Sequence, residues 1–100
     1  ALTTWGKTLS NEVAKSNITV NNILTGYFNT ERLEQLNSEK AKKMGVKVEE
    51  VFDAMKNQVP AKRIGNPKEF GYLATFLSSD HASYINGINI AIDGGLIKSL

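Results

Sequence analysis

The residues best suited to bind a ligand follow two apolar segments, each at the point where the segment ends. Residues 18–24 (ITVNNIL) lead into the polar stretch 25–31, and residues 88–92 (INIAI) lead into an Asp-Gly-Gly turn. In parallel α/β sheets, ligands bind beyond the carboxyl ends of the strands. We therefore expect residues 25–31 and 93–96 to lie together on one binding edge.

The sequence context of the other potentially reactive residues favours structural roles for them. His81 is the only histidine and lies in a polar loop with no nucleophile at motif spacing, which favours a solvated or helix-capping role. Asp93 precedes two glycines, so we expect it to order a turn through hydrogen bonds to its own backbone. The chain has no cysteine, which excludes disulfides, thiolate nucleophiles and cysteine–zinc sites. We name no catalytic residue and no metal ligand in this sequence.

The composition excludes several classes of partner. Twelve Lys and Arg against ten Asp and Glu give a net charge of +2, too small to indicate nucleic-acid binding. No apolar run approaches the roughly 18–20 residues of a membrane span, and no charged-then-apolar signal peptide opens the chain. Together with the absence of cysteine, these features predict a cytoplasmic protein that contacts neither nucleic acid nor membrane.

Apolar periodicity predicts an alternation of helices and strands. The predicted elements are a helix to about residue 15, a strand at 18–24, a helix at 30–44, a helix at 48–59, a helix from Pro67, and a strand at 88–92. Asn66 and Glu69 have the spacing of a capping box, and Gly45 is suited to end the preceding helix. Strands separated by helices favour a parallel sheet.

The predicted elements do not complete a sheet. Two strands cannot form a parallel sheet that is covered on both faces. Helical spacing also begins at Ala1, with no Ser, Asp or Asn to cap the first turn. We therefore expect the chain to be one part of a larger α/β domain whose N-terminal part is missing.

Three segments carry a resemblance to a known family. They are ITVNNILTG followed by Thr30, the helix start R-x-G-x-P-x-E from Arg63 to Glu69, and SYINGINIAIDGG at 83–95. In order and spacing they resemble the C-terminal part of a classical short-chain dehydrogenase/reductase over residues 1–97. The resemblance is to members such as 3-oxoacyl-(acyl carrier protein) reductases or sugar and polyol dehydrogenases.

The resemblance implies a fold. Residues 1–100 would be the C-terminal segment of a single doubly wound Rossmann domain, with its last two strands, lid helices and final helix. Residues 31–62 would be a helical insertion that closes over the substrate. Its inward residues would shape the substrate pocket, although ordinary helix packing explains the same apolar positions equally well. The candidate lid residues are Leu33, Leu36, Phe52 and Met55.

The resemblance also implies a cofactor site for NAD or NADP. The Thr30 hydroxyl and the Phe28 backbone N–H match the groups that hold the nicotinamide carboxamide, and Gly26 would allow the backbone to approach the ring. Thr25 departs from the family's usual Pro-Gly, so the turn should be looser, and its own hydroxyl could contact the cofactor or water. The predicted cofactor-binding residues are therefore Thr25, Gly26, Phe28 and Thr30.

The implied activity is hydride transfer between the cofactor and a small carbonyl or alcohol substrate. The family's Tyr-x-x-x-Lys pair and its serine do not occur in this chain and would lie before Ala1, so the chain alone should be inactive. The resemblance also implies a homodimer or homotetramer, which would form through residues 67–79 and 88–93. The alternative is a non-catalytic binding or structural homologue that keeps the fold and the interface, and Thr25 in place of proline points towards it.

Overall fold

The computed structural model describes residues 2–98. These residues form four α-helices and two short strands, together with two 3₁₀ turns at Ala14–Ser16 and Asp80–Ala82. The elements in chain order are α1 (Leu2–Val13), β1 (Asn22–Thr25), α2 (Glu31–Met44), α3 (Val48–Gln58), α4 (Pro67–Leu77) and β2 (Asn89–Ile92). The predicted order of helices and strands is confirmed.

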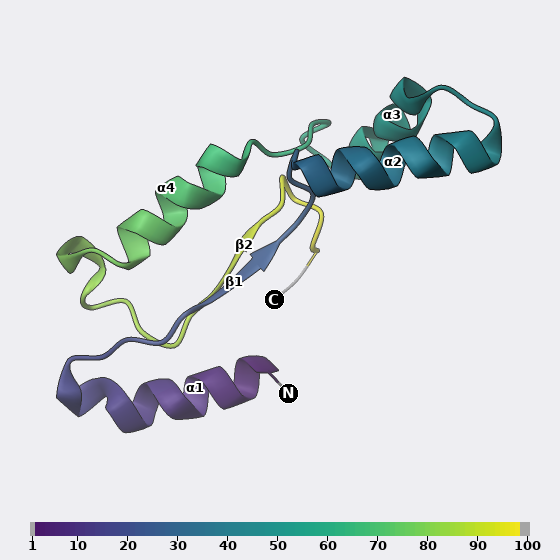
Figure 1. Ribbon diagram of the computed structural model, residues 1–100. Coiled ribbons are helices and arrows are strands. Elements are labelled where there is room, and N and C mark those ends of the chain that lie inside the picture. Colours follow the sequence, from purple (N-terminus) through teal and green to yellow (C-terminus); the bar gives the residue numbers. More distant parts are fainter. Residues whose placement is uncertain (1, 99–100) are drawn as a thin grey trace.

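The two strands pair in parallel and lie between two helices. Asn22 is opposite Asn89 and Thr25 is opposite Ile92. Figure 1 shows α1 on one side of the pair and α4 on the other. A Cβ atom on Gly6 of α1 would lie 2.8 Å from Nδ2 of Asn22, whereas the next residue, Ile23, borders a cavity with Ala74 and Leu77 of α4. Because successive strand residues point to opposite faces, the strand pair is the middle layer of a helix–sheet–helix arrangement.

The first strand begins later than the apolar pattern predicts. Residues 18–21 lie outside β1, and side-chain amides replace part of the expected ladder. Asn21 accepts from the Ile88 N–H at 3.1 Å and donates to the Ile85 carbonyl at 3.3 Å. The prediction of a strand at 18–24 was right about the element and wrong about where it begins.

Helices α2 and α3 form a pair that extends away from one end of the strands (Figure 1). Ala41 of α2 and Val51 of α3 are buried between them. Gly45 ends α2 with a φ of 69°, and the N–H of the next residue donates to the Ala41 carbonyl at 3.1 Å. This left-handed glycine cap confirms the predicted end of the helix.

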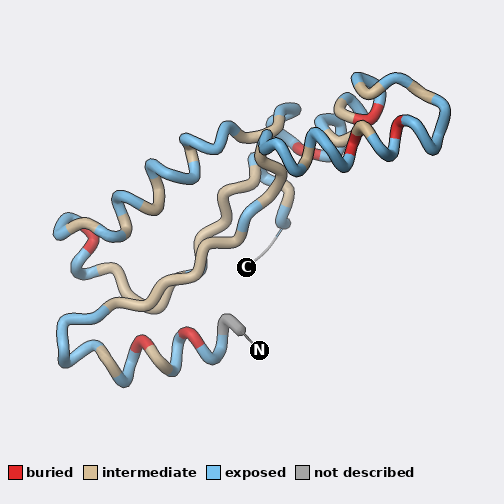
Figure 2. Tube along the Cα trace, in the orientation of Figure 1, coloured by how far each residue is buried: buried red, intermediate tan, exposed pale blue. Residues whose placement is uncertain are grey.

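The buried core is small for the length of chain (Figure 2). The buried apolar residues are Ala41, Val51, Val59 and Ala82, whereas the apolar side chains of β1 and β2 are only half-buried. The radius of gyration is 17.1 Å, compared with about 13 Å for a compact domain of 100 residues. Residues 2–98 therefore do not close a hydrophobic core around their own strand pair. None of the helices within this range has both the length and the apolar character needed to cross a bilayer.

Candidate functional site

An open groove lies where β1 ends and where α2 and α4 begin. Its volume is about 450 Å³. The residues that line it are Thr25, Gly26, Tyr27, Phe28, Thr30, Arg32, Leu33, Leu36, Pro67 and Phe70. The groove thus brings together all four predicted cofactor-binding residues and the first two predicted lid residues.

The backbone of Phe28, a residue that lines this groove, has a donor that the described residues do not satisfy. Gly65 pairs with the segment on one side, because its N–H donates to the Tyr27 carbonyl at 2.8 Å and its carbonyl accepts from the Asn29 N–H at 2.9 Å. In such a parallel bridge the N–H and carbonyl of the middle residue point the opposite way. The Phe28 carbonyl accepts from the Thr30 N–H at 2.9 Å, and within residues 2–98 the Phe28 N–H has no protein acceptor. This N–H is therefore a candidate donor for a ligand.

Thr30 presents a second donor beside the first. It is the N-cap of α2, with φ −110° and ψ 161°, and its Oγ1 accepts from the Leu33 N–H at 3.2 Å. A hydroxyl can accept and donate at the same time. The cap therefore fixes the position of the oxygen while the O–H proton remains free to bond an acceptor in the groove.

A close contact explains why position 26 is a glycine, and the sequence alone does not reveal that contact. A Cβ atom at this position would lie 2.6 Å from Cβ and 2.8 Å from Cα of Asp93. The absence of a side chain therefore lets the chain leaving β1 pass close to the chain leaving β2. Thr25, the last residue of β1, is exposed at the rim of the groove.

Asp93 uses its carboxylate to build the turn after β2. Oδ1 accepts from the Gly95 N–H at 2.9 Å, and Oδ2 accepts from the Ile97 N–H at 2.7 Å. The prediction that Asp93 orders the turn is confirmed. His81 is exposed in the turn Asp80–Ala82.

The far wall of the groove comes from the start of α4, which sequence reasoning did not include in the site. The Phe70 ring packs edge-on against Phe28, with the ring centres 6.1 Å apart and the planes at 85°. Gly65 permits this arrangement, since a Cβ atom there would lie 2.8 Å from Cε1 of Phe28. Gly65, which precedes the predicted capping box, is the feature of the sequence that could have indicated this close contact with Phe28.

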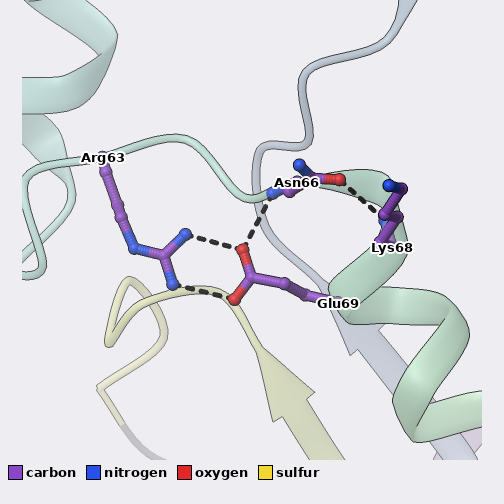
Figure 3. A network of polar contacts seen from close by, with 4 residues as sticks. All are labelled: Arg63, Asn66, Lys68 and Glu69. Atoms are coloured by element: carbon purple, nitrogen blue, oxygen red, sulfur yellow. Dashed lines mark hydrogen bonds and ion pairs between the residues drawn. The ribbon is translucent and has the colours of Figure 1, made fainter.

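A polar clamp holds this wall in place (Figure 3). Arg63 donates two hydrogen bonds to Glu69, at 2.7 and 2.8 Å, and Glu69 also accepts from the Asn66 N–H at 3.0 Å. Asn66 Oδ1 in turn accepts from the Lys68 N–H at 2.9 Å, which completes the predicted capping box. The hydrogen bonds from Arg63 and Asn66 lower the pKa of the Glu69 carboxyl to about 2, and the same contact raises the pKa of Arg63.

The other two predicted lid residues are not among those that line the groove. Met55 faces α2, where its Sδ accepts from Nδ2 of Asn37 at 3.1 Å, and Phe52 is half-buried on α3. The groove and the helix pair are joined by another contact, from the Tyr27 hydroxyl to Oε1 of Gln58 at 3.0 Å. Within residues 2–98, no three His, Cys, Asp or Glu side chains gather closely enough to hold a metal ion.

Comparison with known proteins gives the family. The model described as Enoyl-(Acyl carrier protein) reductase matches residues 1–97. The NADPH-dependent reductase BacG of Bacillus subtilis (strain 168) is 37% identical over 100 residues, which are 100% of this chain and 39% of BacG. The 3-oxoacyl-(acyl-carrier-protein) reductase MabA of Mycobacterium tuberculosis (strain ATCC 25618 / H37Rv) is 32% identical over 90 residues, which are 90% of this chain and 32% of MabA.

Solved structures agree with these matches. L-sorbose reductase from Gluconobacter frateurii, complexed with NADPH and L-sorbose, superposes with a TM-score of 0.90 and 33% identity, over 99% of this chain and 38% of that chain. The chain thus spans less than half the length of these relatives. The family model nevertheless covers almost every residue, and the α/β arrangement agrees with a C-terminal portion of a Rossmann fold. The chain belongs to the short-chain dehydrogenase/reductase family.

Proposed function

We propose that this chain forms the nicotinamide-binding edge of an NAD- or NADP-dependent oxidoreductase that interconverts a small carbonyl compound and its alcohol. The observation that carries the proposal is the pair of donors at the groove. The Phe28 N–H has no protein acceptor within residues 2–98, and the Thr30 hydroxyl is held by its capping bond with its proton free. Family membership supplies the chemical context.

The donor set fits a carboxamide. The oxygen of that group has two lone pairs, so it can accept from an N–H and an O–H together. Two hydrogen bonds to one small group would fix the rotation of the nicotinamide ring, whose role when bound is to carry the hydride. The apolar side chains of Leu33, Leu36 and Phe70 would exclude water from the face next to the ring. Two of the relatives are named for NADPH, which makes NADPH the first cofactor to test.

The remaining roles that we propose for the chain are those of lid and oligomer surface. Helices α2 and α3 would close over the substrate, with Leu33 and Leu36 facing it. Tyr72 and Phe76 of α4 are 71% and 45% exposed, which suits a contact between subunits of a homodimer or homotetramer. No residue of this chain is assigned a proton-transfer role, so the acid and base would come from outside these 100 residues.

Cofactor titration of the intact protein tests this proposal. NADPH and NADH binding would be followed by nicotinamide fluorescence for the wild type, Thr30→Val and Thr30→Ser. Loss of one hydrogen bond should weaken binding by roughly 3- to 10-fold in Thr30→Val. Thr30→Ser keeps a hydroxyl that can cap and donate, so it should bind as the wild type does.

Stability must be measured alongside binding, because Thr30→Val also removes the cap of α2. That loss should cost about 1 kcal/mol of unfolding free energy, and binding should be compared well below the unfolding temperature. Unchanged affinity in Thr30→Val would contradict the assignment of the Thr30 hydroxyl. A wild-type protein that binds neither dinucleotide would favour the non-catalytic homologue.

A further inference from the structure

The side-chain amide of Asn86 joins three segments that are far apart in the sequence. Its Oδ1 accepts from the Val20 N–H at 3.1 Å, and its Nδ2 donates to the Ser10 carbonyl at 3.1 Å. The next residue continues the contact, because the Gly87 N–H donates to the Val20 carbonyl at 2.8 Å. This set of contacts, the Asn86 clamp, ties the end of α1 to the segments that precede both strands.

Asn86 and Gly87 form the only Asn-Gly pair in the sequence. A glycine after asparagine leaves its backbone nitrogen unshielded by a side chain, so that nitrogen can reach the asparagine amide carbon. The clamp itself requires glycine at this position. Gly87 has a φ of 73°, which favours glycine, and a Cβ atom there would lie 2.7 Å from Oγ of Ser10.

We propose that Asn86-Gly87 is a deamidation site that the fold keeps blocked and that local opening of the clamp exposes. In the reaction the Gly87 nitrogen loses its proton to solvent and bonds to Cγ of Asn86. The Cγ–Nδ2 bond breaks as Nδ2 takes up a proton from solvent, ammonia leaves, and a cyclic succinimide remains. Water then opens the ring at either carbonyl and leaves aspartate or isoaspartate at position 86.

The folded clamp opposes each part of this reaction. The attacking nitrogen holds its proton in a 2.8 Å hydrogen bond to Val20. The Asn86 amide is held at both ends and cannot turn towards Gly87 without breaking its bonds to Val20 and Ser10. Reaction therefore requires an opened state, and its rate should follow the population of that state.

The modification would release α1 from the strand pair. An aspartate at position 86 can still accept from the Val20 N–H, but it has no N–H to donate to the Ser10 carbonyl. A carboxylate oxygen would instead face that carbonyl oxygen, and the two repel each other. An isoaspartate adds a backbone carbon and displaces the pairing of Gly87 with Val20.

The rate of deamidation tests the proposal. The intact protein would be incubated at mildly alkaline pH, folded or unfolded in urea, beside a synthetic peptide of residues 82–92 as the unfolded reference. Mass spectrometry would follow the replacement of the amide NH₂ by OH at Asn86. The folded protein should react at least about tenfold more slowly than the peptide and the unfolded protein. Equal deamidation rates in the folded protein and the peptide would contradict the proposal that the fold blocks the reaction. A peptide that does not react would contradict the proposal that Asn86-Gly87 is a deamidation site.

A pair of substitutions tests the consequence. Asn86→Asp should raise the unfolding equilibrium constant by about tenfold, because a buried carbonyl loses its donor. Asn89→Asp is the matched control, since within residues 2–98 the Asn89 side chain uses only its Oδ1, which accepts from Nδ2 of Asn22 at 2.9 Å. It should change that constant by less than about threefold. Equal effects of the two substitutions on the unfolding equilibrium constant would show that the hydrogen bond to the Ser10 carbonyl does not contribute to stability.

Discussion

The two ends of the β1–β2 pair are held by different chemistry. At the amino end, the side-chain amides of Asn21 and Asn86 bond to backbone groups on both neighbouring segments and on α1. At the carboxyl end, the chains leaving the strands come together through the bare backbone of Gly26 against Asp93. The groove next to Gly26 is mostly apolar.

The difference indicates where a ligand can bind. At the amino end, side-chain amides bond the N–H groups of Val20 and Ile88 and the carbonyls of Ser10 and Ile85, so these polar groups are already used within the protein. At the carboxyl end, the Phe28 N–H has no protein acceptor within residues 2–98, and the Thr30 hydroxyl has a proton to donate. Polar groups that the fold positions but does not satisfy are the ones that a ligand can bond without displacing protein contacts.

The largest expected effect comes from adding one carbon at the carboxyl end. Gly26→Ala would place Cβ 2.6 Å from Cβ of Asp93, so the segments that follow β1 and β2 would have to move apart. Overpacking of this kind should destabilise the protein by about 3 kcal/mol, measured by urea denaturation. Gly71→Ala in α4 is the control, because a Cβ atom there meets nothing within 4 Å. That control should stabilise the protein by about 0.5–1 kcal/mol, and equal behaviour of the two variants would rule out close approach as the reason for Gly26.

A smaller loss is expected when an amide is removed from the amino end. Asn21→Ala leaves the Ile88 N–H without its acceptor and the Ile85 carbonyl without its donor, which should cost about 2 kcal/mol of unfolding free energy. Asn29→Ala makes the same change at the carboxyl end, where the Asn29 side chain is exposed. It should alter stability by less than about 0.5 kcal/mol. If both alanine variants unfold at the same urea concentration, the amides do not distinguish the two ends.

The smallest effect concerns the clamp of α4 and depends on pH. The pKa of Glu69 falls from 4.5 to about 2 in the folded state. The contribution of ionised Glu69 to the stability of the folded protein is therefore complete above pH 4.5 and is lost as the pH falls towards 2. Glu69→Gln should remove this part of the acid dependence, as followed by thermal unfolding between these pH values.

The pairing of Glu69 with Arg63 can be tested separately. Arg63→Gln should produce the same loss at neutral pH as Glu69→Gln, and the double variant should lose no more than either one alone. Because both side chains are substantially exposed, the effect should also weaken at high salt. Additive losses in the double variant would contradict the pairing.

Features set by neighbours in the sequence could be predicted from it. Asn66, Pro67 and Glu69 lie within one helical turn, so their capping box depends only on local backbone geometry. The same holds for the glycine end of α2 at Gly45 and for the turn that Asp93 builds with residues two and four positions later. Alternation of apolar residues predicted both strands, and the helices between them predicted the parallel pairing.

Features set by residues distant in the sequence could not be predicted. The Phe70 wall of the groove depends on a contact with Phe28, and the late start of β1 depends on Asn21 meeting residues 85–88. No pattern along the chain shows that a given asparagine bonds to backbone instead of to water. The same limit applies to Met55, whose helical spacing suits the groove as well as it suits the contact with Asn37 that the structure contains.

The sequence by itself determined the elements, their order, and the polar edge at residues 25–31, because periodicity, caps and turns are properties of short segments. It also carried the family resemblance that pointed to Thr30 and Phe28. Only the tertiary structure decided that these two residues line one groove together with Phe70, whose ring packs against Phe28. It also decided that Gly26 is required by Asp93. These outcomes depend on how close separate segments come, and that distance is fixed by packing.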